Sequence, residues 1–201
     1  MKLYSSNMSS NSRRVRLSAA VLGVPLEVIE VDLRTRDRNG LATVNPNNKV
    51  PVLIDGDLEL WESNAINIYL CDRTPGQKLL PTEPRARAEV LRWLFWNTAH
   101  LQTAVSGLNF EHLVKGLMGL GGPDANTVEH HTRLFHQFAK VVDEHLAKHE
   151  WLANDTLSLA DLSVAATMNA PTAKLPVEPY RNLQGLLDRI HARPEWAATA
   201  Q

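Results

Sequence analysis

Two predicted helix starts contain the residues whose types and spacing could support catalysis or anion binding. Ser9 and Ser10 precede one helical pattern, and Glu62 and Ser63 precede the apolar run over residues 65–70. A hydroxyl group at a helix N-terminus adds a hydrogen-bond donor to the positive end of the helix dipole, so it can stabilise an anion. The simpler alternative is that these serines only cap their helices, a common role for serine. We expect Ser63 to be the N-cap of its helix.

The first helix start must be positioned by a strand on either side. Residues 2–6 and 26–33 favour strands, and the spacing of Val15, Ala19 and Leu22 favours a helix between them that ends near Gly23. A strand, a helix and a strand within about thirty residues indicate a βαβ unit with parallel strands. The polar positions of the helix are assigned to Arg13, Arg14 and Arg16.

The second helix start follows a predicted hairpin. Residues 52–54 and 58–60 are short apolar or alternating runs, and Gly56 between them tolerates the positive φ of a tight turn. Pro51 stands where the first strand begins, a position where its missing N–H does least harm. The βαβ unit, the hairpin and the helix after it predict a thioredoxin-like arrangement over residues 1–75.

The chain changes character after a linker rich in proline. From residue 85 to 201 the apolar spacing predicts helices only, with long helices over residues 91–101 and 128–146. Ser158 and Asp161 form a capping-box pattern, which is structural rather than catalytic. The predicted fold class is therefore an α/β thioredoxin-like domain, residues 1–75, followed by an all-α domain, residues 85–201.

Composition restricts the partners. A formal net charge of -1 gives no reason to expect a nucleic acid or an anionic membrane, and no apolar run approaches the length of a membrane span. The single cysteine, Cys71, cannot form an internal disulfide, and no signal-peptide pattern begins the sequence, so we expect a cytoplasmic protein. Of the eight histidines, His130, His131 and His136 come closest to a metal-binding group, but they include no His-x-x-x-His pair on a common helix face, so no metal is expected.

Two motifs carry a family resemblance. Asn-Lys-Val-Pro-Val-Leu from Asn48 and Trp-Glu-Ser-Asn-Ala-Ile from Trp61 resemble the glutathione-binding half of the glutathione S-transferases. The resemblance implies a cis peptide bond before Pro51, which leaves the backbone of Val50 free to pair with the cysteinyl unit of glutathione. It places Lys49, together with Asn48, beside the glycyl carboxylate.

The same resemblance gives the two helix starts their roles. Glu62 and Ser63 are similar to the family's clamp on the γ-glutamyl group, with carboxylate to ammonium and hydroxyl to carboxylate. The run Ser-Ser-Asn-Ser-Arg-Arg-Val-Arg-Leu resembles the zeta-class motif and the serine-type delta and phi classes, whose functional serine falls on Ser9, with Ser10 as the next candidate. Lowering a thiol pKa of about 8.5 by about 2 units requires roughly 2.7 kcal/mol of thiolate stabilisation, and the Ser9 hydroxyl is suited to supply it.

These resemblances leave alternative functions open. Asn11 stands where the zeta class has a cysteine, and a serine two places before an asparagine is similar to the nu class of glutathione-dependent disulfide reductases, which hold two glutathione units. A non-catalytic binding or interaction module of the same fold is a third hypothesis. The leading prediction is a homodimeric glutathione transferase with a role in detoxification and glutathione as co-substrate. Its electrophile pocket is predicted in the helical domain near Trp96, His100 and Thr103.

Overall fold

The computed structural model describes residues 1–35, 38–169 and 174–199. The chain divides into two compact units. The first, called here the sheet unit, consists of Met1–Leu80 with His191–Gln201, and the second, the helical unit, is Pro81–Ile190. The structure thus groups the C-terminal residues with the sheet, whereas the sequence analysis assigned them to the helical domain. The assignment of functions to residues 1–75 and 85–201 stays a prediction.

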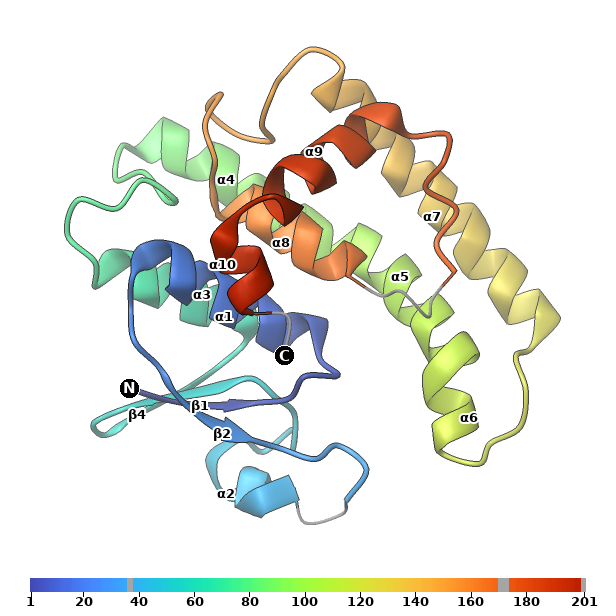
Figure 1. Ribbon diagram of the computed structural model, residues 1–201, viewed down its shortest axis with the longest axis horizontal. Helices are drawn as coiled ribbons and strands as arrows, with labels where there is room; N and C mark the ends of the chain where they lie inside the picture. Colours follow the sequence, from blue (N-terminus) through green and yellow to red (C-terminus); the bar gives the residue numbers. More distant parts are fainter. Residues whose placement is uncertain (36–37, 170–173, 200–201) are drawn as a thin grey trace. The chain divides into compact units, whose positions relative to one another are not determined.

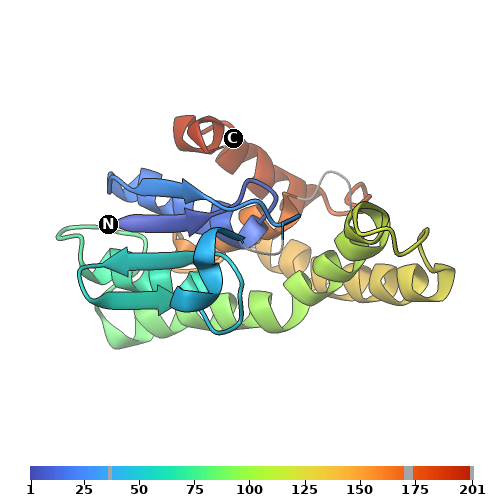
Figure 2. The ribbon, with the colours of Figure 1, turned by 90° about the horizontal axis from the view of Figure 1, so that it is seen from below.

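A four-stranded sheet forms the centre of the sheet unit. The strands are β1 (Lys2–Ser5), β2 (Glu27–Glu30), β3 (Val52–Asp55) and β4 (Leu58–Trp61), in the order β2-β1-β3-β4. Strand β2 is parallel to β1, and β3 is antiparallel to both β1 and β4. Figure 2 shows this order, from the blue strands to the cyan hairpin. The predicted βαβ unit and hairpin are confirmed, and Gly56 has φ 63 in the turn.

Alternating side chains of the strands pack against helices on the two faces of the sheet. On one face Leu3 and Leu53 join Val15 and Ala19 of α1 (Ser10–Leu22) and Ile66 and Leu70 of α3 (Ser63–Asp72). On the other face Val52 and Tyr4 lie against Leu41 of α2 (Leu41–Val44), which follows η1 (Arg38–Gly40). Helix α1 ends at Gly23, whose φ of 68 and N–H bonds to Ala19 and Ala20 match the predicted end.

Two of the arginines at the polar positions of α1 are buried. Arg13 is 8% exposed and Arg14 only 1%. The Arg13 guanidinium lies 3.8 Å from the ring centroid of Trp196 in α10 (Pro194–Ala198) and donates to the Trp196 carbonyl at 3.1 Å. A guanidinium tolerates burial when an aromatic face and hydrogen-bond acceptors replace water. Periodicity could not reveal this, because the residues that bury Arg13 lie some 180 positions away.

The helical unit begins with one long helical run that contains two π-helical segments (Figure 1). Its elements are α4 (Pro84–Trp96), η2 (Asn97–Leu101), α5 (Gln102–Asn109), η3 (Phe110–Val114) and α6 (Lys115–Leu117), followed by α7 (Ala125–Leu146), α8 (Leu159–Met168) and α9 (Arg181–His191). No helix in the described part of the chain has the length and apolar character needed to cross a membrane.

Helix α8 is buried along its whole length, and its start is a complete capping box. The Asp161 carboxylate accepts hydrogen bonds from the backbone N–H groups of Leu152 and Ser158 and from the Ser158 hydroxyl, each at 2.8 Å. The Ser158 Oγ in turn accepts from the N–H of Ala160. Burial raises the pKa of Asp161 to about 6, against the lowering effect of these bonds. The predicted structural role of Ser158 and Asp161 is confirmed.

Candidate functional site

Ser9 is the N-cap of α1, and Ser10 is the first residue of the helix. The Ser9 Oγ accepts a hydrogen bond from the backbone N–H of Ser12 at 3.2 Å. A hydroxyl that accepts in this way still has its own hydrogen to donate. Ser9 as a whole residue is half-buried. The geometry supplies a hydrogen-bond donor at the positive end of a 13-residue helix.

The start of α3 differs from the prediction in one respect. Glu62, not Ser63, is the N-cap, and it makes no side-chain cap hydrogen bond. Its φ of 72 is uncommon for a residue other than glycine, and such conformations cost on the order of 1–3 kcal/mol and cluster at ligand sites. The positive φ turns the chain into the helix so that Ser63 is its first residue, 6% exposed, while the Glu62 side chain remains exposed.

A buried arginine lies against Ser63, and the sequence analysis missed it. Arg14 Nη1 on α1 donates to Ser63 Oγ at 2.9 Å and to Asn64 Oδ1 at 3.4 Å. Burial lowers the pKa of Arg14 to about 10, and the negative charge of Glu62 opposes the shift. Arg14 is therefore still a cation at neutral pH. The Ser63 oxygen accepts from Arg14, and its hydroxyl hydrogen can still be donated to another acceptor.

The loop before β3 contains the predicted cis bond, between Val50 and Pro51. Two main-chain carbonyls hold this loop: Asn45 Nδ2 donates to the carbonyl of Lys49 at 2.7 Å, and Arg38 Nη1 donates to the carbonyl of Asn48 at 2.7 Å. The Lys49 side chain is exposed and Asn48 is half-buried. The loop thus presents a cation at the edge of the sheet unit while its backbone is fixed.

Comparison with known proteins places this geometry in a family. The N-terminal domain of the glutathione S-transferases matches residues 1–72, and their C-terminal domain matches residues 123–198. Glutathione S-transferase 3 of Zea mays is 35% identical over 208 residues, which cover 99% of this chain and 92% of that protein. This chain belongs to the glutathione S-transferase family.

Further relatives of this glutathione S-transferase cover nearly its whole length. Glutathione S-transferase GstB of Escherichia coli (strain K12) is 30% identical over 96% of this chain and 93% of its own. The solved structure of a glutathione S-transferase-I bound with the ligand lactoylglutathione has a TM-score of 0.85 at 25% identity, and the match covers 99% of this chain and 97% of that one. The predicted fold, a thioredoxin-like domain followed by a helical domain, is confirmed.

The residues predicted for the electrophile pocket of this transferase lie in the helical unit. Trp96 and His100 share one aromatic neighbour, with ring centroids 6.0 Å and 5.1 Å from Phe138 of α7. Thr103 is exposed, and its hydroxyl donates to the carbonyl of Ala99 in the same helical run. The structure brings Trp96 and His100 together and leaves Thr103 apart from that cluster. Their contact with a substrate stays a prediction.

Two further observations concern the chemistry available to this transferase. Among the residues that the structure describes, no group of three or more histidine, cysteine, aspartate and glutamate side chains could hold a metal ion. Cys71, the single cysteine of the sequence, is 1% exposed in the core of the sheet unit, beside Leu70. A buried cysteine of this kind behaves as a small apolar residue.

Proposed function

We propose that this protein is a glutathione transferase that binds glutathione in its sheet unit and uses Ser9 to stabilise the thiolate for attack on an electrophilic substrate. The observation that carries the proposal is the bond from Arg14 to Ser63. Arg14 belongs to the helix that Ser9 caps, and Ser63 begins the other helix on the same face of the sheet. One buried cation therefore links the two candidate anion sites.

The γ-glutamyl end of glutathione is assigned to the start of α3. Its carboxylate accepts from the Ser63 hydroxyl and lies at the positive end of the helix dipole, where the Arg14 charge adds to the attraction. Its ammonium group pairs with the exposed carboxylate of Glu62. The uncommon backbone conformation of Glu62 supports this role, because it separates the carboxylate from the helix cap.

The rest of the tripeptide is assigned to the loop that leads into β3. The backbone of Val50 pairs with the cysteinyl unit, in the manner of an added strand. The exposed ammonium group of Lys49 meets the glycyl carboxylate, with Asn48 beside it. The fixed carbonyls of both residues support this assignment, since a loop held in one conformation loses less entropy on binding.

Ser9 serves the chemical step. The thiol of bound glutathione releases its proton to solvent, and the Ser9 hydroxyl donates a hydrogen bond to the resulting thiolate. The sulfur then forms a bond to the electrophilic carbon of the substrate, while the leaving group departs with its electron pair. Because the thiolate charge is lost in the product, Ser9 stabilises the reactive form at neutral pH rather than the product.

The relatives favour this function over the two alternatives, because they are named glutathione S-transferases. The disulfide reductase alternative depends on Asn11, in the first turn of α1, as a contact for a second sulfur. We extend the proposal to a homodimer in the cytoplasm, with Trp96 and His100 on the electrophile side. The electrophile itself is proposed only as a class, a small organic molecule with a displaceable group.

The test measures two activities in two variants. Ser9→Ala should raise the pKa of bound glutathione, followed through the ultraviolet absorbance of its thiolate. It should also slow conjugation of a dinitrohalobenzene by about ten- to a thousandfold, the range for one oxyanion-type donor. Asn11→Ala should leave conjugation nearly unchanged, and Ser106→Ala, an exposed serine of α5, is the matched control. Disulfide reduction that depends on Asn11, beside negligible conjugation by the wild type, would overturn the proposal.

A further inference from the structure

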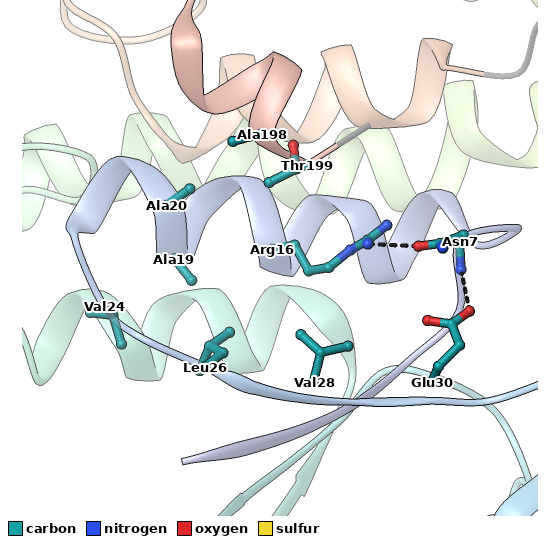
Figure 3. A pocket seen from close by; sticks show the side chains of 10 residues that line it. All are labelled: Asn7, Arg16, Ala19, Ala20, Val24, Leu26, Val28, Glu30, Ala198 and Thr199. Carbon is teal, nitrogen blue, oxygen red and sulfur yellow. Dashed lines mark hydrogen bonds between the residues drawn. The ribbon is translucent and has the colours of Figure 1, made fainter. Parts of the chain in front are cut away.

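Asn7 is an exposed residue in the turn between β1 and α1 that is bonded on two sides. Its side-chain oxygen accepts a hydrogen bond from Arg16 Nη1 at 2.7 Å, and its backbone N–H donates to Glu30 Oε1 at 3.0 Å. Arg16 belongs to α1, and Glu30 is the last residue of β2. Figure 3 shows the Arg16 and Glu30 side chains reaching Asn7 from these two elements, and we call the three residues the Asn7 bridge.

The Asn7 bridge forms the polar end of a depression of about 400 Å³ in the sheet unit. Its remaining walls are apolar or small side chains from α1, β2, the segment that connects them, and α10: Ala19, Ala20, Val24, Leu26, Val28, Ala198 and Thr199. Burial lowers the pKa of Arg16, while the charge of Glu30 raises it. Each hydrogen bond of the bridge has a charged side chain as donor or acceptor, and such bonds are stronger than those between neutral groups.

The inner side of the same turn is fixed by its own hydrogen bonds. The Ser6 N–H donates to Ser12 Oγ at 3.2 Å, and the Ser9 N–H donates to the Ser6 carbonyl at 3.0 Å. Ser9 follows Asn7 by two residues. The turn that leads to the Ser9 N-cap is therefore bonded to Ser12 of α1 and to the Arg16 and Glu30 side chains, which restricts its movement.

We propose that Asn7, Arg16 and Glu30 are positioning residues, which hold the Ser9 hydroxyl at the place where it stabilises the thiolate of glutathione. The inference rests on the proposed function of Ser9. None of the three residues is assigned to a contact with glutathione. A reacting group displaced by about 1 Å can lose on the order of a hundredfold in rate. Hydrogen bonds that add little to stability can therefore matter more for catalysis.

The first experiment removes the hydrogen bond between the Arg16 and Asn7 side chains. Asn7→Ala should raise the pKa of bound glutathione by about half a unit to one unit and lower kcat for conjugation about three- to tenfold, since the donor is loosened rather than lost. The Kd of glutathione should change less than about twofold, because the γ-glutamyl contacts lie on α3. Arg16→Ala removes the same bond from the other side and should reproduce the pKa shift. Asn7→Asp keeps the acceptor oxygen and should restore kcat.

A double variant separates positioning from a merely structural role. Adding Asn7→Ala to Ser9→Ala should cause no further loss of kcat, because the hydroxyl to be positioned is gone. An equal loss in both backgrounds would overturn the inference. Asn126→Ala, an exposed asparagine at the start of α7, is the matched control. If Ser9→Ala itself leaves the thiol pKa unchanged, the proposed function fails; if Ser9→Ala raises it and Asn7→Ala does not, only the Asn7 bridge is overturned.

Discussion

Two helices of this protein begin with a serine and an acidic residue, and the two starts are built in opposite ways. At α8 the Ser158 hydroxyl donates to Asp161, whose carboxylate also accepts two backbone N–H groups, so the polar groups bond to one another. At α3 Glu62 makes no side-chain cap hydrogen bond, and Ser63 accepts from Arg14 instead.

The difference shows that the same residue types can either satisfy one another's hydrogen bonds or leave hydrogen-bonding groups available. The start of α8 is closed, because its donors and acceptors satisfy each other and Asp161 has no exposed surface. The start of α3 is open, because Glu62 makes no side-chain cap hydrogen bond and is exposed, while the Ser63 oxygen is bonded to Arg14 rather than to its own helix. A closed start contributes to folding stability, and an open one keeps part of its hydrogen-bonding capacity for a ligand.

Removal of the Asp161 carboxylate from the closed start should cause the largest change, a loss of folding stability. Asp161→Ala leaves two buried N–H groups without an acceptor, at about 1–3 kcal/mol each, so we expect a loss of roughly 3 kcal/mol or more. In a chain of this size that lowers the melting temperature by roughly 6–12 °C. Calorimetry should show this loss with unchanged glutathione affinity. Glu62→Ala at the open start should instead weaken glutathione binding and leave the melting temperature nearly unchanged. A large loss of stability in Glu62→Ala would contradict the comparison.

The closed start should also give the protein a characteristic dependence on pH. The pKa of Asp161 is raised to about 6 in the folded state, so the folded protein binds the proton more tightly than the unfolded chain does. Its contribution to stability is present below pH 4 and is lost as the pH rises through about 6, by at most about 3 kcal/mol. Wild type and Asp161→Asn should therefore differ in the slope of melting temperature between pH 4 and 6. Parallel slopes would show that Asp161 does not titrate in this range.

At the open start the buried cation should control affinity. Arg14→Lys keeps the positive charge but loses the planar fork that reaches Ser63 and Asn64, so Ser63 is no longer held in place by the guanidinium. We expect the Kd of glutathione to rise about thirtyfold, or ~2 kcal/mol, in titration calorimetry. An unchanged Kd would exclude Arg14 from the γ-glutamyl site. Lys2→Arg, which also exchanges one basic side chain for the other but at an exposed position of β1, is the control.

The smallest expected effect comes from the serines themselves, which form a matched pair. Ser63→Ala should raise the Kd of glutathione about tenfold, since the carboxylate loses one hydrogen bond worth about 1–2 kcal/mol. Ser158→Ala should leave the Kd unchanged and lower the free energy of unfolding by about 1 kcal/mol, the usual cost of an N-cap. Equal changes of affinity in the two variants would remove the distinction between an open and a closed start.

Local patterns were sufficient to predict the elements and one of the two helix starts. Gly56 marks the hairpin, Gly23 ends α1, and the Ser158-Asp161 spacing predicts the capping box, because each of these features depends on neighbours within a few residues. Ser9 was placed at the N-terminus of α1 for the same reason.

Tertiary structure decided which residues contact the start of α3. Arg14 reaches Ser63 across 49 positions, and Arg13 reaches Trp196 across 183. Helical periodicity assigns both arginines to the surface, because it counts apolar neighbours along one helix and cannot include a partner from elsewhere in the chain. The N-cap at Glu62 was missed because a positive φ in a residue other than glycine leaves no signal in the residue type. The sequence by itself therefore determined the start of α8, and the start of α3 to within one residue. Only the long-range contacts of the folded sheet unit placed Ser63 against a buried cation, because those contacts replace the water that Arg14 would otherwise require.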